Sequence, residues 1–239
     1  MSMLLDTSQR TSDIEIMDDF SIEGEVLHDT LDKLAGINKW LGGNKVTLQG
    51  VKQLLRNHPK EKSVTIVDLG CGGGDILRDI AAFGRKNGFT PELIGIDANP
   101  NVLDYASQRC EDYPEISFLH HDIFSEEFNT LEYDIVITTL FLHHFSASEI
   151  EHTLALILNK VSLGIVINDL HRSTMAYYLF RLLCTVITNN QMVIQDGLTS
   201  VRRGFKRDDL VEISQTLGVR PQIYWRWAFR YLWIIQKSL

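Results

Sequence analysis

A run of glycines followed by an acidic residue is the first feature whose residue types and spacing indicate chemistry. Four of the five residues at positions 70–74 are glycine, after the β-branched run 64–67 and before a helical pattern that begins at Asp75. Glycines at a turn from a strand into a helix let the backbone take positive φ and approach a ligand closely. A plain connection between two elements needs no such run, so the turn predicts a nucleotide-type ligand.

The spacing within this turn distinguishes two classes of cofactor. The dinucleotide fingerprint G-x-G-x-x-G, counted from Gly70, requires a glycine at position 75, where the sequence has Asp75. A carboxylate close to a pyrophosphate repels it. With Asp68 just before the glycines, the turn suits a zwitterionic amino acid on a sulfonium, as in S-adenosyl-L-methionine (SAM). An NAD(P)-dependent oxidoreductase and a non-catalytic nucleoside-binding module are the alternatives.

Acidic residues also stand at the ends of the next two apolar runs. Asp97 ends the second run, where a carboxylate can accept hydrogen bonds from both ribose hydroxyls. Asp122 follows the third run and could accept a hydrogen bond from an adenine amino group, while Ile123 packs against the ring. The carboxyl ends of parallel strands meet at one edge of a sheet, and open α/β folds bind ligands there. We therefore expect Asp68, Asp97 and Asp122 at one site.

Strand and helix patterns alternate from residue 63 onwards. The predicted strands are 64–67, 93–96, 116–119, 133–138 and 163–168, and the predicted helices between them are 75–84, 100–109 and 148–159. This alternation is typical of βαβ units and a parallel sheet. A helix at 207–217 and two strands, 222–228 and 231–236, follow. We predict an α/β, Rossmann-like fold with a seven-stranded, mostly parallel sheet that ends in an antiparallel hairpin.

The glycine turn, Asp97, Asp122 and the segment DIVITTLFLHHF at 134–145 resemble class I SAM-dependent methyltransferases. Among these, the small-molecule enzymes of ubiquinone and menaquinone biosynthesis are the most similar, over about residues 63–170. The resemblance implies methyl transfer from SAM to a small acceptor. It also implies a set of cofactor-binding residues: Asp68, Gly70, Cys71, Gly72, Asp97, Ala98, Asp122, Ile123, Thr138 and Thr139.

Three segments outside this core, at 15–19, 168–173 and 196–205, resemble a bacterial subgroup associated with aromatic polyketide or quinone-like products. This looser resemblance implies an aromatic or phenolic, quinone-like or polyketide-derived acceptor. O-methylation is then favoured, while C- and N-methylation use the same cofactor half.

The segments that flank the alternating pattern are predicted to be helical. An acidic arm with recurring apolar positions leads into two helical stretches, and an apolar helical stretch interrupts the pattern after residue 171. We predict an N-terminal arm and helical cap at 1–60, and a methyltransferase domain at 61–239 with a helical lid insertion at about 171–205. Arg202 and Arg203 pair either with an acidic acceptor or with the acidic arm.

Histidines near strand ends are the candidates for a general base. A phenolic or enolic oxygen must lose a proton to accept a methyl group, and histidine titrates near neutral pH. His143 and His144 follow the fourth predicted strand and His171 follows the fifth; capping of the next turn or helix is the structural alternative for each. Arg172 could stabilise a phenolate.

Composition excludes several classes of partner. The net charge is −8 without a basic stripe, so no nucleic-acid partner is predicted. The apolar stretch 175–187 is shorter than the ~20 residues of a membrane span, so no integral membrane segment is predicted. Cys71, Cys110 and Cys184 have no metal-site spacing, and no secretory signal is visible, so we predict no metal and a cytoplasmic location. The sequence permits a homodimer without establishing one.

Overall fold

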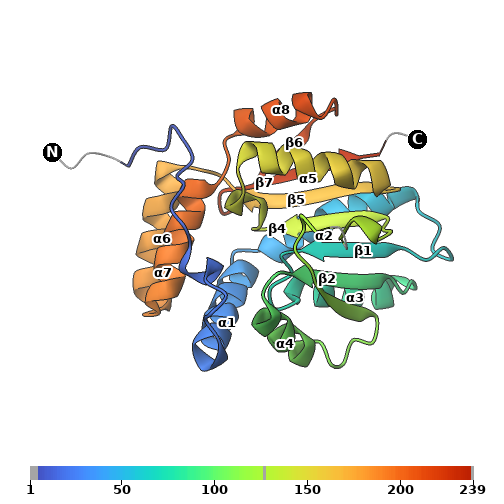
Figure 1. Ribbon diagram of the computed structural model, residues 1–239, viewed down its shortest axis with the longest axis horizontal. Coiled ribbons are helices and arrows are strands. Elements are labelled where there is room, and N and C mark those ends of the chain that lie inside the picture. The colour runs from blue at the N-terminus through green and yellow to red at the C-terminus, as the bar shows by residue number, and fades with distance from the viewer. Residues whose placement is uncertain (1–4, 126–127, 238–239) are drawn as a thin grey trace.

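The strand pattern of the sequence builds one seven-stranded sheet (Figure 1). The computed structural model describes residues 5–125 and 128–237, so the first four residues of the expected arm lie outside the described residues. The strands are β1 (Thr65–Leu69), β2 (Glu92–Asp97), β3 (Ile116–His120), β4 (Ile135–Thr139), β5 (Gly164–Leu170), β6 (Gln222–Arg226) and β7 (Arg230–Gln236). Their order across the sheet is β3-β2-β1-β4-β5-β7-β6.

The pairing of these strands confirms the expected fold class. The five strands from β3 to β5 are parallel, whereas β7 runs antiparallel to both β5 and β6. β7 lies against β5 and β6 forms the edge, so the terminal hairpin folds back into the sheet. β1 and β5 each extend two residues further at their carboxyl ends than the sequence suggested, and this places Asp68 and Asp169 inside strands.

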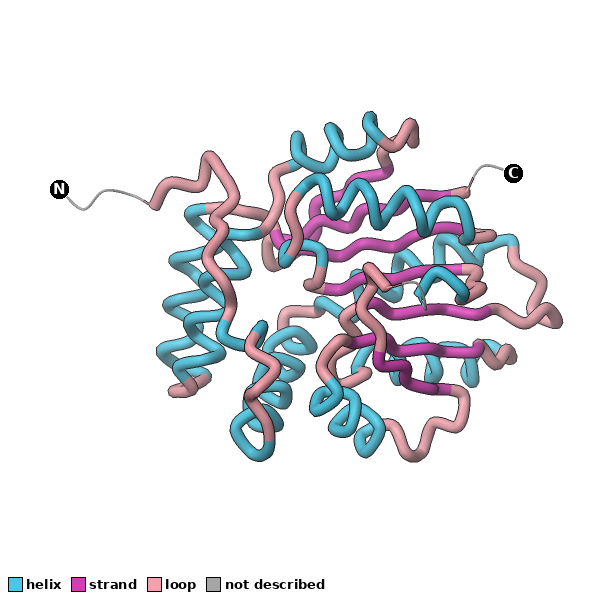
Figure 2. The backbone as a smooth tube through the Cα atoms, viewed as in Figure 1, coloured by secondary structure: helices cyan, strands magenta, loops and turns pink. Residues whose placement is uncertain are grey.

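Helices cover both faces of the sheet (Figure 2). They are α1 (Gly24–Trp40), α2 (Gly43–Leu54), α3 (Asp75–Asn87), α4 (Pro100–Arg109), α5 (Ala147–Lys160), α6 (Thr174–Ile187), α7 (Gln191–Arg203) and α8 (Arg207–Thr216). Short 3₁₀ turns are η1 (Ile16–Asp18), η2 (Leu55–Asn57), η3 (Phe128–Thr130) and η4 (Leu142–His144).

Local sequence signals determine where several helices begin. The Asn99 side chain accepts a hydrogen bond from the Asn101 N–H at the start of α4, with Pro100 as the first helical residue. Ser146 and Glu149 form a capping box at the start of α5. Gly42, with φ +77°, separates α1 from α2, because few other residues adopt that conformation without strain.

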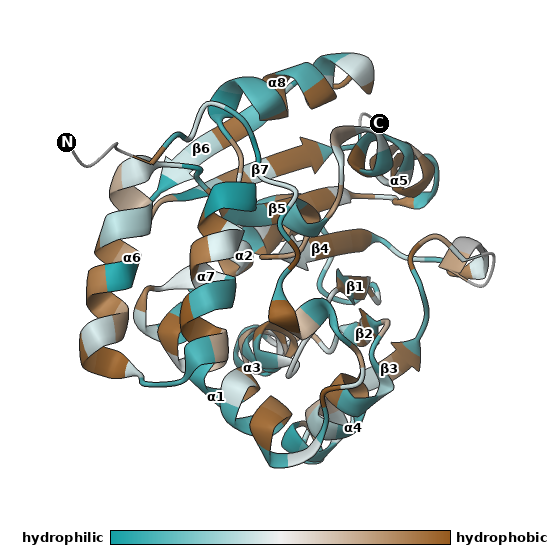
Figure 3. Ribbon diagram, turned by 60° about the vertical axis from the view of Figure 1, so that its left-hand side comes forward, coloured by the Kyte–Doolittle hydropathy of each residue, from teal (hydrophilic) through white to brown (hydrophobic). Residues whose placement is uncertain are grey.

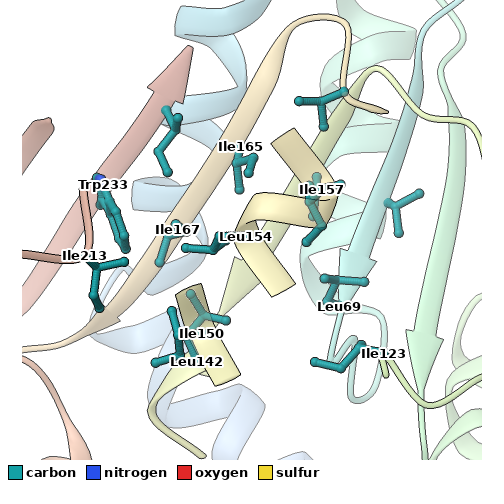
Figure 4. Packing of buried hydrophobic residues seen from close by; sticks show 14 of the residues in the cluster. Leu69, Ile123, Leu142, Ile150, Leu154, Ile157, Ile165, Ile167, Ile213 and Trp233 are labelled. Atoms are coloured by element: carbon teal, nitrogen blue, oxygen red, sulfur yellow. The ribbon is translucent and has the colours of Figure 1, made fainter. Parts of the chain in front are cut away.

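The core consists of two clusters, one on each face of the sheet. On one face, Leu154 and Ile157 of α5 pack against Ile165 and Ile167 of β5 and against Trp233 of β7 (Figure 4). On the other face, α2 and α3 pack against the same strands through a second buried cluster. The central strands are therefore buried on both sides, and β4 and β7 appear largely brown, the colour of hydrophobic residues, in Figure 3.

The N-terminal helix and the insertion lie together beside the carboxyl ends of the parallel strands. α1 contacts α7, and α6 and α7 form an antiparallel pair rather than one long element (Figures 1 and 3). Met175, Leu182 and Val186 of α6 are exposed, so α6 is not a buried helix. The division into cap, domain and lid stays a prediction. No helix in the described part of the chain has the length and apolar character to cross a membrane.

Candidate active site

A cavity of about 800 Å³ opens at the carboxyl ends of the parallel strands. Its walls come from the turns that follow β1, β2, β3 and β4, from α1, α6 and α7, and from the turn between β6 and β7. The volume lies within the range of small-molecule and cofactor sites. Its position is the one that an open α/β sheet offers to ligands.

The glycine turn after β1 forms the floor of one end of this cavity. Gly70 and Gly72 have φ of +66° and +50°, a region that favours glycine. A Cβ at Gly70 would lie 2.1 Å from a carbon of the Phe141 ring, so no larger residue fits there. A Cβ at Gly72 would meet no atom within 4 Å, which leaves the backbone open to a ligand. Cys71 also lines the cavity, and burial raises the pKa of its thiol.

A buried carboxylate, Asp68, and a half-buried one, Asp97, flank the turn, and neither forms an ion pair with a described residue. Asp68 is 1% exposed, and its Oδ1 has no hydrogen-bond partner among the described residues. Burial raises the pKa of Asp68 well above its usual value, and the charges of Asp97 and Asp75 add to this shift. Burial also raises the pKa of Asp97, although the N–H groups of Asn99 and Gly72 donate to its carboxylate at 3.0 and 3.3 Å. Asp75 differs because it forms an ion pair with Arg78.

The segment that follows β3 lines the same part of the cavity as the glycine turn and Asp97. Asp122 is exposed, and its Oδ1 accepts a hydrogen bond from the Phe124 N–H at 2.9 Å. Ile123 is buried, and it lines the cavity together with Asp122 and Ala98. A polar edge beside an apolar wall suits a heteroaromatic ring.

One of the expected cofactor-side residues lies elsewhere. Thr138 is fully buried on the face of β4 that packs against α5, and it does not line the cavity. Because side chains alternate along a strand, only one of Thr138 and Thr139 can face α2. Thr139 does so: its Oγ1 lies 2.8 Å from Thr47 Oγ1 of α2, and it lines the cavity. The expectation for Thr138 is therefore wrong.

The histidine pair after β4 lies at the centre of the cavity wall. His143 is 1% exposed, and its Nδ1 lies 2.7 Å from Oδ1 of Asp169. On its other side, Nε2 lies 3.4 Å from Oε1 of Glu15, a residue of the N-terminal arm. His144 stacks on His143 with ring centroids 4.4 Å apart, and its Nδ1 lies 2.9 Å from Asp18 Oδ1. Both histidines line the cavity.

The two carboxylates decide the protonation state of His143. Burial lowers the pKa of His143, but the charges and hydrogen bonds of Asp169 and Glu15 outweigh burial and raise the pKa to about 9. Burial raises the pKa values of Asp169 and Glu15, and the imidazolium outweighs this and lowers both. In the ligand-free protein, His143 is therefore an imidazolium between two carboxylates.

His171 and Arg172, the other two candidates for catalysis, lie outside the cavity lining. Nδ1 of His171 accepts a hydrogen bond from Trp225 Nε1 at 3.3 Å, and the ring packs edge-on against Tyr231. Arg172 is 2% exposed, and it donates to the backbone oxygens of Thr7, Ser8 and Gly204 and pairs with Asp209 at 2.9 Å. Since its guanidinium is occupied in this way, Arg172 cannot reach a phenolate in the cavity. His171 is therefore not placed to act as a base in the cavity, and Arg172 is not placed to stabilise a phenolate there.

Arginines and one aspartate hold the N-terminal arm over the histidines. Arg203 donates to His143 O at 3.1 Å and pairs with Asp18 at 3.2 Å, and Arg202 pairs with Asp13. The Asp196 carboxylate of α7 accepts hydrogen bonds from Ile16 N and Met17 N at 2.7 and 3.0 Å. Of the two partners expected for Arg202 and Arg203, the structure therefore pairs them with the arm.

Three of these groups could also hold a metal ion. Glu15, His143 and His144 each bring one nitrogen or oxygen to within 4.8 Å of the others. The expectation of no metal stays a prediction.

Sequence reasoning missed Glu15 and Arg230 on the cavity wall, and Asp169, which contacts His143 from behind the wall. Glu15 and Asp169 lie in the segments that carry the looser family resemblance, so that resemblance was the available signal. Arg230 stands in the terminal hairpin and gave no signal, because only the position of β7 beside β5 brings it to the cavity.

Part of the chain matches a family model, and the fold is shared with solved methyltransferase structures. Residues 66–162 match the family model described as a methyltransferase domain. No curated protein matches the sequence. Residues 66–162 therefore carry a methyltransferase domain, and solved structures that share the fold contain SAM or S-adenosylhomocysteine, the cofactor class that the sequence predicted.

Solved structures share the fold at low sequence identity. Human N-acetylserotonin methyltransferase in complex with SAM is 17% identical, with a TM-score of 0.66 over 96% of this chain and 60% of that chain. An O-methyltransferase family protein from Burkholderia thailandensis is 14% identical, with a TM-score of 0.66 over 96% and 65%. Magnesium protoporphyrin IX methyltransferase from Synechocystis PCC 6803, with bound SAM, is 15% identical, with a TM-score of 0.56 over 93% and 89%.

Proposed function

We propose that this protein transfers the methyl group of SAM to an oxygen of a small aromatic acceptor, of the phenolic, quinone-like or polyketide-derived kind. The observation that carries the proposal is the unpaired Asp68 carboxylate beside the glycine turn, in one cavity with the His143–Asp169 pair. The first feature suits a cationic donor, and the second suits removal of a proton.

The cofactor half fits SAM by charge. Asp68 is buried and Asp97 is half-buried, neither forms an ion pair with a described residue, and an ammonium or sulfonium nearby would stabilise both carboxylates. A diphosphate would add negative charge to a place where Asp68, Asp97 and Asp75 already repel one another. Asp68 is assigned to the amino acid part of SAM and Asp97 to the ribose hydroxyls. Asp122 and Ile123 are assigned to the adenine. This fit disfavours the NAD(P)-dependent alternative.

The glycine turn gives the cofactor room to lie against the backbone. Gly70, Cys71 and Gly72 with Ala98 and Thr139 complete the set assigned to SAM, all of them on the cavity wall. When bound, SAM supplies an electrophilic methyl group on a positively charged sulfur. Positioning of that methyl group in line with the acceptor oxygen is the main contribution expected of the protein.

The His143–Asp169 pair is the candidate for proton removal. Asp169 holds Nδ1–H of the imidazole, which leaves Nε2 to take the proton of the acceptor hydroxyl. Nε2 faces Glu15 in the ligand-free protein, and an imidazolium with a pKa of about 9 cannot act as a base at pH 7. The acceptor hydroxyl must therefore take the place of Glu15 at Nε2, and this lowers the pKa of His143 toward the working range.

Apolar side chains form the rest of the acceptor half. Phe141 and Phe145 lie edge to face with ring centroids 5.0 Å apart, and both line the cavity opposite Phe180 and Leu183 of α6. Flat apolar walls of this kind suit an aromatic ring. The acceptor class rests on this shape together with the sequence resemblance.

The test is a methyl-transfer assay with isotopically labelled SAM and a panel of phenols, hydroquinones and polyhydroxylated aromatic polyketides. We expect labelled O-methyl ethers, formed in a one-to-one ratio with S-adenosylhomocysteine. Products labelled on carbon would contradict O-methylation. Tight cofactor binding without transfer to any member of the panel would favour the non-catalytic binding module.

A further inference from the structure

Arg230, the first residue of β7, is a buried cation without a partner. It is 2% exposed, and its Nε and Nη1 have no hydrogen-bond partner among the described residues. Burial lowers its pKa to about 10, and Asp169 is the charge that opposes this shift from a distance. The carboxylate of Asp169 is engaged with His143 and with the Leu170 N–H, and it forms no ion pair with Arg230.

The other buried arginines show what a structural guanidinium looks like in this protein. Arg172 makes four hydrogen bonds to protein oxygens, including one to Asp209. Arg203 donates to backbone oxygens and pairs with Asp18. A buried charge without such bonds costs free energy unless a ligand supplies them. Arg230 therefore differs from a stabilising arginine.

Gly43, which has no side chain, leaves space for the Arg230 guanidinium on the cavity wall. Arg230 lines the cavity, and a Cβ on Gly43, the first residue of α2, would lie 3.0 Å from its Cζ. Asn38 is the polar neighbour there, and its Oδ1 is likewise unpartnered. An amide oxygen is neutral, so Asn38 cannot balance the charge of the guanidinium.

The turn before Arg230 has an uncommon backbone. Ala228 and Phe229 both have positive φ, +60° and +54°, which residues other than glycine rarely adopt. The Phe229 carbonyl oxygen accepts a hydrogen bond from the His171 N–H at 2.8 Å, which fixes the turn against the end of β5. Strained residues of this kind persist where the surrounding structure holds them, and they cluster at ligand sites.

We propose that Arg230 binds an anionic oxygen group, a carboxylate or an ionised phenol, of the acceptor. β7 lies three strands from β1, roughly 14 Å at ~4.8 Å per strand, so Arg230 belongs to the acceptor half and not to the glycine turn. The carboxylate of SAM itself is a second source of the same chemistry. The identity of the acceptor rests on the proposed function, whereas the anion site does not require methyl transfer.

The test compares thermal unfolding of the wild type with that of Arg230→Met and Arg230→Lys, without a methyl donor. The probes are hydroxynaphthoates and hydroxybenzoates, each with its matched amide. We expect the carboxylates to raise the Tm of the wild type and of Arg230→Lys but not of Arg230→Met, and the amides to raise none. We also expect ligand-free Arg230→Met to melt at a higher temperature than the wild type, since it lacks the unpaired charge.

A second binding measurement distinguishes the acceptor from the cofactor as the source of the anion. It compares S-adenosylhomocysteine with 5′-methylthioadenosine, which lacks the amino acid carboxylate. We expect the affinity of Arg230→Met for both to match that of the wild type within twofold. A tenfold loss for S-adenosylhomocysteine alone would support the anion site with the cofactor as its source. A wild type that no carboxylate stabilises, with cofactor binding equal in both variants, would overturn the site. A lower Tm of ligand-free Arg230→Met would overturn it too, because protein groups would then already balance the charge.

Discussion

The two halves of the cavity are built in different ways. The cofactor half comes from consecutive strand ends, with Asp68 near the end of β1, Gly70 and Gly72 just after β1, and Asp97 at the end of β2. The acceptor half comes from segments far apart in the chain: the N-terminal arm with Glu15, the turn after β4 with His143, the helices α6 and α7, and the hairpin before Arg230. The cofactor half therefore depends on local backbone geometry, whereas the acceptor half depends on charge pairing between segments that are far apart in the chain.

The sharpest way to separate the halves is to remove the imidazole of the acceptor half. His143→Gln should lower kcat by about 10²-fold or more, because a general base contributes about that much, and it should leave the dissociation constant of S-adenosylhomocysteine unchanged. Steady-state kinetics and calorimetry measure the two values. His171→Ala is the matched control and should keep kcat within about twofold, because His171 lies outside the cavity. Equal losses in both variants would contradict the assignment.

The converse change lies in the cofactor half. Asp97→Ala should weaken S-adenosylhomocysteine binding about tenfold or more, because hydrogen bonds to a charged group contribute ~1.5–3 kcal/mol. Calorimetry measures the affinity. Asp122→Ala should have a smaller effect, since Asp122 is exposed and water can replace its hydrogen bonds. Unchanged affinity of Asp97→Ala would refute the ribose assignment.

The arm can be loosened without touching the cavity chemistry. Asp196→Ala removes the acceptor of the Ile16 and Met17 N–H groups, so we expect a severalfold higher KM for the acceptor at constant cofactor affinity, and faster cleavage near residue 16 in limited proteolysis. Asp13→Ala removes the exposed contacts of this carboxylate with Arg202 and with the Thr11 side chain, and it should change neither value. A loss of cofactor affinity in Asp196→Ala would argue against two separable halves.

The pH dependence of stability gives the most graded effect. The pKa of His143 is raised from 6.5 to about 9 in the folded protein, so its contribution is fully present below pH 6.5 and is lost as the pH rises through 9. The contribution is at most about 3 kcal/mol. Urea unfolding of the wild type should therefore show a fall in stability over this interval, and His143→Gln should show a smaller one. Parallel slopes in the two proteins would mean that His143 is not charged in the folded state.

The sequence predicted the cofactor half because its signals are local. A glycine run, an acid at a strand end and an alternating apolar pattern each depend on a few neighbouring residues, and these gave the fold class and nine of the ten cavity positions expected for SAM. Thr138 was expected on the cavity wall but lies on the other face of β4, because the face that a strand residue occupies depends on the register, which the sequence did not establish. His171 and Arg172 were also expected at the cavity. A position just after a strand does not determine where the side chain points, and these two side chains point toward the edge strands and the arm.

The acceptor half could not be predicted to the same depth for a physical reason. The partners of His143 lie 26 residues away at Asp169 and far away at Glu15, and no local pattern pairs them. Arg230 reaches the wall because β7 inserts between β5 and β6, a matter of sheet order rather than of its own neighbours. Charged residues whose partners are distant require the three-dimensional structure.

The most direct test of the central claim is calorimetric titration of the wild type with S-adenosylhomocysteine and, separately, with NADH. The carboxylates of Asp68 and Asp97 should favour S-adenosylhomocysteine, which offers hydrogen-bond donors and carries no phosphate. We therefore expect saturable one-to-one binding of S-adenosylhomocysteine and no measurable heat with NADH. Binding of NADH at equal or higher affinity would contradict the account.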